Sequence, residues 1–253
     1  MFHRRTLILL AILTVIGAGV GWAQSPDFVA MLRAIDANGD FGTQDYSAVF
    51  TIVTQKPGEK DSVIEVKLFR RDEHDQMVWI MLKPEAQKGQ GFLKVDENIW
   101  MYDPESGKFN HSTMKEQIQN SKAKSSDLKR TSYANDYDID TTSEGVLGKY
   151  PVWIVSLKAK NNEVSYASVK LSIRKDKPLV LKEEDYSLSD RLMRTVYFPP
   201  TYIEVAGKTI SSQMLIVDEL NKGEKSQLTI SDVSVAPLPD ATFSKAFLSQ
   251  SSK

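Results

Sequence analysis

Apolar and polar residues alternate along much of the chain, a pattern typical of β-strands that bury one face. The first clear run covers residues 46–52, where Phe50 is one of the alternating apolar positions. Residues 56–59 have the turn sequence Lys-Pro-Gly-Glu, and the alternation resumes over residues 64–68. Two such runs with a turn between them predict a β-hairpin.

Residues 77–82 are apolar at every position instead of at every second one. On a strand, Met77, Trp79 and Met81 point to one side, and the residues between them point to the other. An unbroken apolar run of this length predicts a strand that is covered on both faces.

Further short strands are predicted, with Gly, Pro, Asn or Asp at their ends. They cover residues 91–95, 98–103, 151–158, 165–174, 179–186, 191–198, 202–205, 208–218 and 226–235. Many short strands with regular turn signals predict an antiparallel sheet, barrel or sandwich, so the predicted fold class is mainly β.

Two stretches have the spacing of a helix instead. Ser-Pro-Asp at residues 25–27 is a typical helix start, with Ser25 as the cap; apolar residues then recur over 28–35, and Asn-Gly at 38–39 is a typical stop. Near the other end of the chain, Pro-Asp at 239–240 precedes an apolar pattern over 243–247. We therefore expect two short helices that cover the sheet.

The stretch from residue 113 to residue 144 breaks this rhythm, because it is long, polar and rich in Lys, Ser, Asp and Tyr. Loops of this length are usually functional or mobile. Within it, residues 125–127 could cap a weak helix that carries Leu128, Tyr133 and Tyr137. The alternating acids at 136–140 lack the Gly and Glu of a calcium loop, so we expect a solvated turn there.

Residues 1–23 have the pattern of a cleavable export signal. His3, Arg4 and Arg5 precede an apolar run over residues 7–20, and small residues then precede a predicted cut at Gln24. The alternative is a retained transmembrane anchor, which needs about 20 apolar residues, more than this glycine-containing run provides. We expect an exported chain that works outside the cytoplasm, without a stable membrane anchor.

Composition narrows the possible partners. Removal of the signal would leave 253 − 23 = 230 residues, with 30 basic and 33 acidic side chains and a net charge of −3. Nucleic acid is not an expected partner, because phosphate binding needs a basic surface. The chain contains no Cys, which excludes disulfides, thiol chemistry, cysteine zinc sites and a lipid-bearing Cys at the cut.

The sequence contains none of the usual hydrolase, metalloprotease or nucleotide-binding motifs. His74 and His111 lie at predicted loop positions, and neither has a ligand-spaced partner. We therefore expect no enzyme activity, no catalytic or metal-binding residues and no cofactor. The alternative, an enzyme on an unfamiliar β scaffold, would use acids such as Asp103 and Glu105, although acids beside a turn more often solubilise the surface.

Large apolar side chains are concentrated in one quarter of the chain. In an ordinary domain they would form the core. The alternative is a hollow, because a curved sheet can have strands that are apolar on both sides, and Met suits variable apolar ligands. The candidates to line such an apolar cavity are Phe50, Trp79, Met81, Trp100 and Tyr102. The alternation of side chains along a strand places Trp79 and Met81 on one face of their strand, and Trp100 and Tyr102 on one face of theirs. It does not show which face points inward.

A set of short motifs then points to a known family. They are Lys-Pro at 83–84, Lys-Gly at 88–89, Phe-Leu at 92–93, Ile-Trp-Met-Tyr-Asp-Pro at 99–104 and the closing segment 239–248. With these motifs the chain resembles the outer-membrane lipoprotein-sorting family, the LolA-like periplasmic lipoprotein carriers, and their RseB-like relatives. A Ser-Asp-aromatic signature of that family could correspond to residues 126–128 or to residues 132–136.

The resemblance implies one lipid- or lipoprotein-binding domain over residues 24–253, folded as an incomplete antiparallel β-barrel closed by a few helices around an apolar cavity. It also implies a soluble periplasmic carrier that binds acyl chains of lipoproteins or lipids and moves them toward the outer membrane, between an inner-membrane donor complex and an outer-membrane acceptor. The alternative is an envelope-sensing module of the same fold that binds a membrane-anchored protein. Some family members gate the cavity with an arginine; Arg70 and Arg71 are expected to be solvated or paired.

Overall fold

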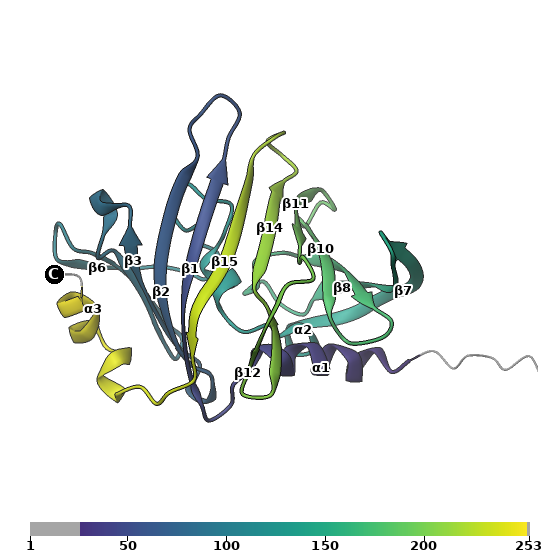
Figure 1. Cartoon of the computed structure of the whole chain (residues 1–253), viewed down its shortest axis with the longest axis horizontal. Helices are drawn as coiled ribbons and strands as arrows, with labels where there is room; N and C mark the ends of the chain where they lie inside the picture. Colours follow the sequence, from purple (N-terminus) through teal and green to yellow (C-terminus); the bar gives the residue numbers. More distant parts are fainter. Residues whose placement is uncertain (1–25, 252–253) are drawn as a thin grey trace, which may run out of the picture.

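Within residues 26–251, the range that the computed structural model describes, thirteen antiparallel strands form one large curved sheet (Figure 1). The predicted export signal at residues 1–23 lies outside the described residues. The strands are β1 (Asp45–Gln55), β2 (Ser62–Arg71), β3 (Gln76–Lys83), β4 (Gly91–Val95), β5 (Asn98–Asp103), β6 (Lys108–His111), β7 (Tyr137–Leu147), β8 (Tyr150–Ala159), β9 (Ser168–Arg174), β10 (Val180–Tyr186), β11 (Leu192–Tyr197), β14 (Gln213–Asp218) and β15 (Lys225–Ser234). A separate hairpin contains β12 (Tyr202–Val205) and β13 (Lys208–Ser211).

The helices are short. In sequence, one lies near each end of the described chain and one lies between β6 and β7, the two edge strands. They are α1 (Phe28–Gly39), α2 (Tyr133–Asp136) and α3 (Lys245–Ser251), with single 3₁₀ turns η1 (Asp72–His74), η2 (Glu85–Gln87), η3 (Ser125–Leu128) and η4 (Asp240–Phe243). The mainly β fold class is confirmed. No helix in the described part of the chain is both long enough and apolar enough to cross a membrane.

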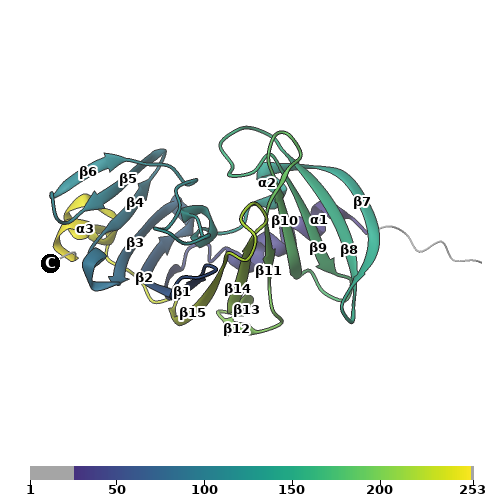
Figure 2. The same cartoon turned by 90° about the horizontal axis from the view of Figure 1, so that it is seen from above.

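The strand order shows why the sheet stays open. The first strand, β1, lies in the middle of the sheet, and the following strands are added one after another as far as β6 at one edge. The chain then crosses to β7 at the opposite edge and zigzags back to β15, which pairs with β1. Figure 2 shows the result, a trough whose two edges do not meet, with α1, α2 and the crossing segment inside and α3 outside. The expected incomplete antiparallel barrel is therefore confirmed.

Residues 77–82 form most of β3, and its two faces belong to different apolar clusters. Trp79 and Met81 pack on the concave side, while Val78 and Ile80 pack beneath α3 on the other side. The prediction of a strand covered on both faces is confirmed. The predicted hairpin is also confirmed, since β1 and β2 pair in antiparallel register with Phe50 opposite Val66.

A third cluster joins α1 to the far half of the sheet. Leu32 and Ile35 of α1 are buried against side chains of β8 and β9, such as Val155 and Leu171. α1 begins after Asp27, whose carboxylate accepts a hydrogen bond from the backbone N–H of Ala30 at 3.0 Å. The predicted cap at Ser25 is therefore wrong by two residues, because the short Asp27 side chain is the one that reaches the free N–H.

The sequence prediction missed the two edge strands, β6 and β7. The predicted long loop ends early, because residues 137–147 form β7 instead of continuing irregularly. The acids at 138 and 140 lie on this strand, so the predicted acidic turn is wrong. β7 is mostly exposed on both faces, which leaves no apolar alternation to reveal it. The predicted strand 208–218 is also divided, into β13 and β14.

Candidate functional site

Three of the five predicted cavity residues lie together on the concave face. Phe50, Trp79 and Met81 are at most 3% exposed and belong to one apolar cluster. The Trp79 ring stacks on Phe92 of β4 at a centroid distance of 5.9 Å. This cluster forms a continuous apolar surface across β1 to β4.

Trp100 and Tyr102 lie on the opposite face of the sheet. Trp79 is directly opposite Phe92, and Phe92 is directly opposite Met101. Directly paired residues share a face, so Met101 is on the side of Trp79, and its neighbours Trp100 and Tyr102 point the other way. They belong to the cluster beneath α3. The structure therefore does not bring the five candidates into one site.

The segment that crosses from β6 to β7 covers the concave apolar surface. We call residues 112–132 the strap. Its buried apolar side chains, Ile118, Ala123 and Leu128, belong to the same cluster as Trp79. Most of its other residues are Lys, Ser, Thr, Gln, Asn or Asp. The strap therefore covers an apolar surface with few apolar side chains of its own.

Ion pairs fasten the strap to the sheet. Lys122 of the strap lies 2.7 Å from a carboxylate oxygen of Asp218 and 2.5 Å from one of Glu224. Its backbone N–H donates to Ser226 Oγ on β15 at 2.9 Å. Despite partial burial, these carboxylates raise the pKa of Lys122, because they favour its charged form.

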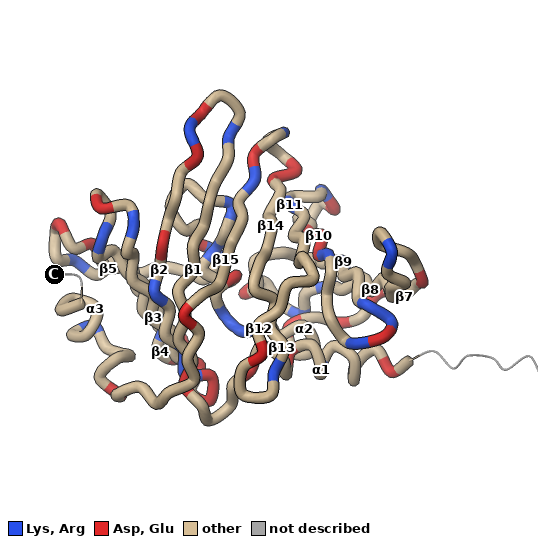
Figure 3. The backbone as a smooth tube through the Cα atoms, viewed as in Figure 1, with Lys and Arg blue, Asp and Glu red and all other residues tan. Residues whose placement is uncertain are grey.

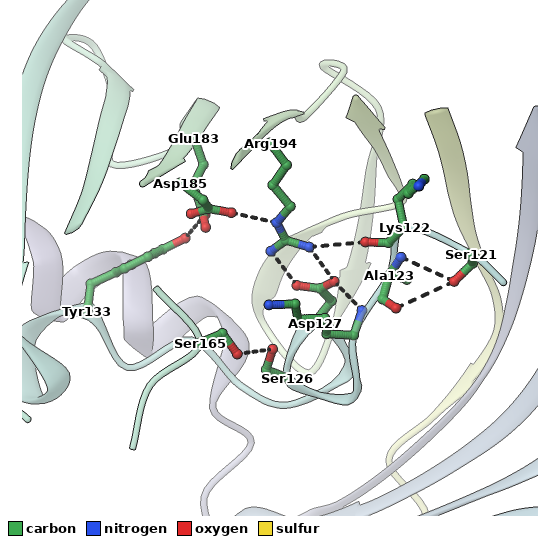
Figure 4. Close-up of polar contacts among 11 residues, drawn as sticks. Ser121, Lys122, Ala123, Ser126, Asp127, Tyr133, Ser165, Glu183, Asp185 and Arg194 are labelled. Carbon is green, nitrogen blue, oxygen red and sulfur yellow. Dashed lines mark hydrogen bonds and ion pairs between the residues drawn. The ribbon is translucent and has the colours of Figure 1, made fainter. Parts of the chain in front are cut away.

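Arg194 of β11 is the centre of a second, more deeply buried fastening (Figure 4). Its guanidinium forms two hydrogen bonds of 2.7 Å with the carboxylate of Asp127 in the strap, and its Nε donates to Asp185 Oδ2 on β10 at 2.6 Å. Asp127 also accepts a hydrogen bond from the backbone N–H of Lys124 and so caps η3. A bidentate pair of this kind is both strong and geometrically specific.

Two acids on the same face of β10 extend this network. Glu183 lies two residues before Asp185, and the hydroxyl of Tyr133 donates to Glu183 Oε2 (Figure 4). Burial and the neighbouring Asp185 raise the pKa of Glu183 well above its usual range. Asp185 Oδ1 is buried, and no ordinary hydrogen-bond donor among the described residues reaches it. A protonated Glu183 would supply that donor. Burial also raises the pKa of Asp185, but the charge and hydrogen bond of Arg194 favour its ionised form, so Glu183 is the acid of this pair that holds a proton.

Polar atoms without partners are found at the boundary between the strap and the sheet. Trp79 Nε1, Ser112 Oγ and Ser125 Oγ are buried and have no hydrogen-bond partner among the described residues. Each such atom typically costs about 1–3 kcal/mol relative to a satisfied one. The contact between the strap and the sheet therefore leaves buried polar atoms without hydrogen bonds.

The two expected arginines are both paired. Arg70 forms an ion pair with Asp72 at 2.8 Å and donates to the carbonyl of Leu128 in the strap at 3.4 Å. Arg71 pairs with Asp45 at 2.8 Å, and this contact lowers the pKa of the Asp45 carboxyl. Arg70 and Arg71 were expected to be either solvated or paired, and the structure shows that both are paired.

The other candidate groups lie outside the concave face. His74 is exposed in η1, and His111 ends β6. Asp103 accepts hydrogen bonds from the backbone N–H of Glu105 and from Ser106 Oγ, which lower the pKa of its carboxyl and stabilise the turn after β5. In the described chain, no group of three or more His, Asp or Glu side chains is arranged to hold a metal ion.

Two small hollows open on the surface. One, of about 190 Å³, lies between α1 and α2 and is lined mainly by polar residues such as Arg33 and Asp36. The other, of about 240 Å³, lies beside β3 and is lined by residues that include Met81 and Lys88. Neither extends over Phe50 or Trp79, because the strap fills the trough there.

A family model described as "Uncharacterized protein" matches residues 73–250. The chain belongs to this family. No curated protein matches the sequence. Solved structures show the fold: a LolA superfamily protein from Nitrosomonas europaea is 20% identical, with a TM-score of 0.75 over 86% of this chain and 97% of that one.

Two further structures agree with this fold. A DUF1329 family protein from Desulfovibrio piger has a TM-score of 0.77, and a putative outer membrane lipoprotein-sorting protein domain from Vibrio parahaemolyticus has a TM-score of 0.76. Each is 18% identical, and each match covers 87% of this chain and 97% of the other. The resemblance to LolA-like proteins is therefore confirmed at the level of the fold.

The sequence prediction missed the polar half of this LolA-like trough. Lys122, Asp127 and Arg194 were not predicted as site residues, although residues 125–127 were singled out as a cap. A usable signal was the pair Glu183 and Asp185, because two acids on one face of a predicted interior strand need buried partners. Their partners are distant in sequence and could not be matched from spacing alone.

Proposed function

We propose that this protein is a periplasmic carrier that binds acyl chains of lipoproteins or lipids on the concave apolar surface and moves them toward the outer membrane. The strap is the lid that must move for binding. The observation that carries the proposal is the contrast between the two partners: an apolar surface around Phe50, Trp79 and Met81 is covered by a mostly polar segment.

The energetics suit reversible binding. Each buried CH₂ group contributes roughly 0.8 kcal/mol, so part of an acyl chain is enough to replace the few apolar side chains with which the strap covers this surface, namely Met114, Ile118, Ala123 and Leu128. The strap's ion pairs then return to water, where charged groups are well solvated. Trp79 Nε1, which has no partner beneath the strap, offers a hydrogen bond to a carbonyl group of the ligand.

The fold likeness supports the same class of protein. One structure with this fold is named a putative outer membrane lipoprotein-sorting protein domain. In our proposal the chain is a carrier and not an enzyme, it works outside the cytoplasm after signal removal, and it meets a donor in the inner membrane and an acceptor at the outer membrane.

A disulfide that locks the strap tests the proposal. Ser126 Oγ of the strap lies 3.0 Å from Ser165 Oγ in the β8–β9 loop, and the chain has no Cys of its own. We expect oxidised S126C/S165C to lose binding of a fluorescent acylated peptide and to regain it when a reductant is added. Side chains this close are suitable for a disulfide.

The matched control is T51C/T229C, a directly opposite pair on β1 and β15 that leaves the strap free. It should bind the probe in both redox states. Equal binding by oxidised and reduced S126C/S165C would show that the strap is not the lid. Protein purified from the periplasm should also carry lipid detectable by mass spectrometry, and absence of both lipid and probe binding would refute the carrier function itself.

A further inference from the structure

Basic side chains and aromatic rings gather at one end of the sheet, far from the strap's fastenings. The positions are the turn between β7 and β8, the turn between β9 and β10, and the start of β12. Figure 3 shows Lys and Arg segments on the loop beside β8 and near the end of β7. We call Lys149, Arg174, Lys175 and Lys177, with the rings beneath them, the basic aromatic end.

Each of these four bases lies over a ring. Arg174 and Lys149 lie 4.6 and 5.4 Å from the centroid of Tyr150. Lys175 lies 4.1 Å from the Trp153 ring, and Lys177 lies 5.2 Å from the Tyr202 ring. Cations over rings at these distances hold the side chains in place at the surface, and of the four bases Lys149 and Lys177 are the exposed ones.

The charge of this end is positive, although the whole chain has one more acid than base. Lys175 pairs with Glu144 at 2.6 Å, and Arg174 pairs with Asp176. Lys149 and Lys177 form no ion pair with any described residue within 4 Å. Two unneutralised lysines therefore remain at the tips of adjacent turns.

An exposed aliphatic side chain completes the pattern. Val146, three residues before Lys149, is 73% exposed, the second most exposed large apolar side chain of the described chain. Tyr and Trp rings favour the boundary between water and lipid, and an aliphatic side chain at a turn tip can enter the headgroup region. A lysine near an anionic bilayer surface is attracted to the negative potential of its headgroups.

We propose that the basic aromatic end docks the protein on an anionic phospholipid surface. The combination of unpaired lysines, rings and an exposed Val146 fits a bilayer interface better than an acidic protein, for which the exposed aliphatic side chain would have no partner. This docking is independent of acyl-chain binding beneath the strap, so either proposal can fail without the other.

Vesicle sedimentation tests the proposal. Mature protein is mixed with vesicles of pure phosphatidylcholine or of phosphatidylcholine with 30% phosphatidylglycerol. We expect binding to the anionic vesicles only, and its loss in 0.5 M salt, because exposed charges are screened. K149E/K177E should bind at least about tenfold more weakly, since two favourable charges become repulsive.

The control is K60E/K222E, which makes the same change of charge on exposed turns at the β1–β2 and β14–β15 tips. It should bind like the wild type. If both variants bind equally weakly, the binding depends on net charge alone and not on this end of the sheet, which would overturn the proposal. Equal binding to both vesicle types would also overturn it, and so would no binding at all. Matching circular dichroism and acylated-probe binding by both variants verify that the fold and the concave site are intact. Capture of an acidic protein without vesicle binding would also overturn it.

Discussion

Glu183 has the most unusual environment of any single residue in the network. It is an acid buried beside a second acid, with Tyr133 as donor, and its pKa is raised well above the usual range because burial and Asp185 both disfavour a further negative charge. In the unfolded chain the same carboxyl loses its proton above about pH 4.5. Folding at neutral pH therefore takes up a proton at this residue.

This uptake gives a pH dependence with a definite sign. The unfolded state binds fewer protons than the folded state, so Glu183 lowers the free energy of unfolding as pH rises from about 4.5 toward its folded pKa. We expect E183Q to remove this slope, because the amide mimics the protonated acid. Above about pH 4.5 the wild type should lose stability relative to E183Q as pH rises toward the folded pKa of Glu183, by up to about 1.4 kcal/mol per pH unit.

Urea unfolding at several pH values measures the difference. E184Q is the matched control, because Glu184 alternates to the other face of β10 and pairs with Lys182 at 2.9 Å. It should keep the wild-type slope. Parallel curves for the wild type and E183Q would contradict a protonated Glu183.

Single residues also show what the sequence could and could not predict. Alternation correctly separated Trp79 and Met81 from their neighbours, because that rule is local. It could not relate Trp79 to Trp100, since the relation depends on two turns and on the pairing of β3 with β4 and of β4 with β5. The partnership of Arg194 with Asp127 was out of reach for the same reason, as 67 residues separate them.

Among the elements, the strap and α3 cover opposite faces of β3 and β4 in different ways. The strap is held mainly by ion pairs, whereas α3 is held by apolar contacts around Leu248. The close approach of Leu248 to β4 requires Gly91, where an added Cβ would overlap the Leu248 side chain and lie 3.1 Å from the carbonyl oxygen of Trp79.

We therefore expect G91A to push α3 off the sheet and to lower the free energy of unfolding by about 1–3 kcal/mol, the usual cost of overpacking. Hydrogen exchange should accelerate in α3 while the strap stays protected. G39A is the comparison, because its Cβ would meet its nearest neighbour at an ordinary 3.5 Å. An unchanged exchange rate in α3 would show that Gly91 does not seat this helix.

Strands whose apolar residues are flanked by turn residues were predictable, and the two edge strands of the large sheet were not. β4, β5 and β12 have the predicted bounds, since turn residues flank a short apolar core. β7 was predicted as part of a loop, because an exposed edge strand has no apolar periodicity. The strap was predicted only as a long polar segment, and its covering role depends on β6 and β7 being at opposite edges.

At the scale of the whole molecule, the two halves of the sheet exchange their covering helices. α1 precedes the first half of the sheet but packs on β8 and β9 of the second. α3 follows the second half but packs on β3 to β5 of the first. Together with the β1–β15 pairing, this exchange makes each half dependent on the other.

We expect one cooperative unfolding transition, which would support the predicted single domain over residues 24–253. Calorimetry should give equal calorimetric and van't Hoff enthalpies, as for a two-state domain. Intrinsic fluorescence and circular dichroism should report the same midpoint. Two resolved transitions would show that the halves unfold separately and would overturn the single-domain prediction.

The pairing of β1 with β15 also determines the order in which the molecule can be completed. Thr54 and Ser226, whose hydroxyls hydrogen-bond across this pair of strands, are 172 residues apart. β1 is the first strand to emerge from a ribosome or a translocation channel, and β15 is the last. The edge of β1 that pairs with β15 therefore stays unpaired until almost the whole chain has emerged. Closing so large a loop is slow, and an unpaired strand edge invites aggregation. A nascent chain of this topology therefore has a long interval in which a chaperone that shields β1 would increase the yield of folded protein.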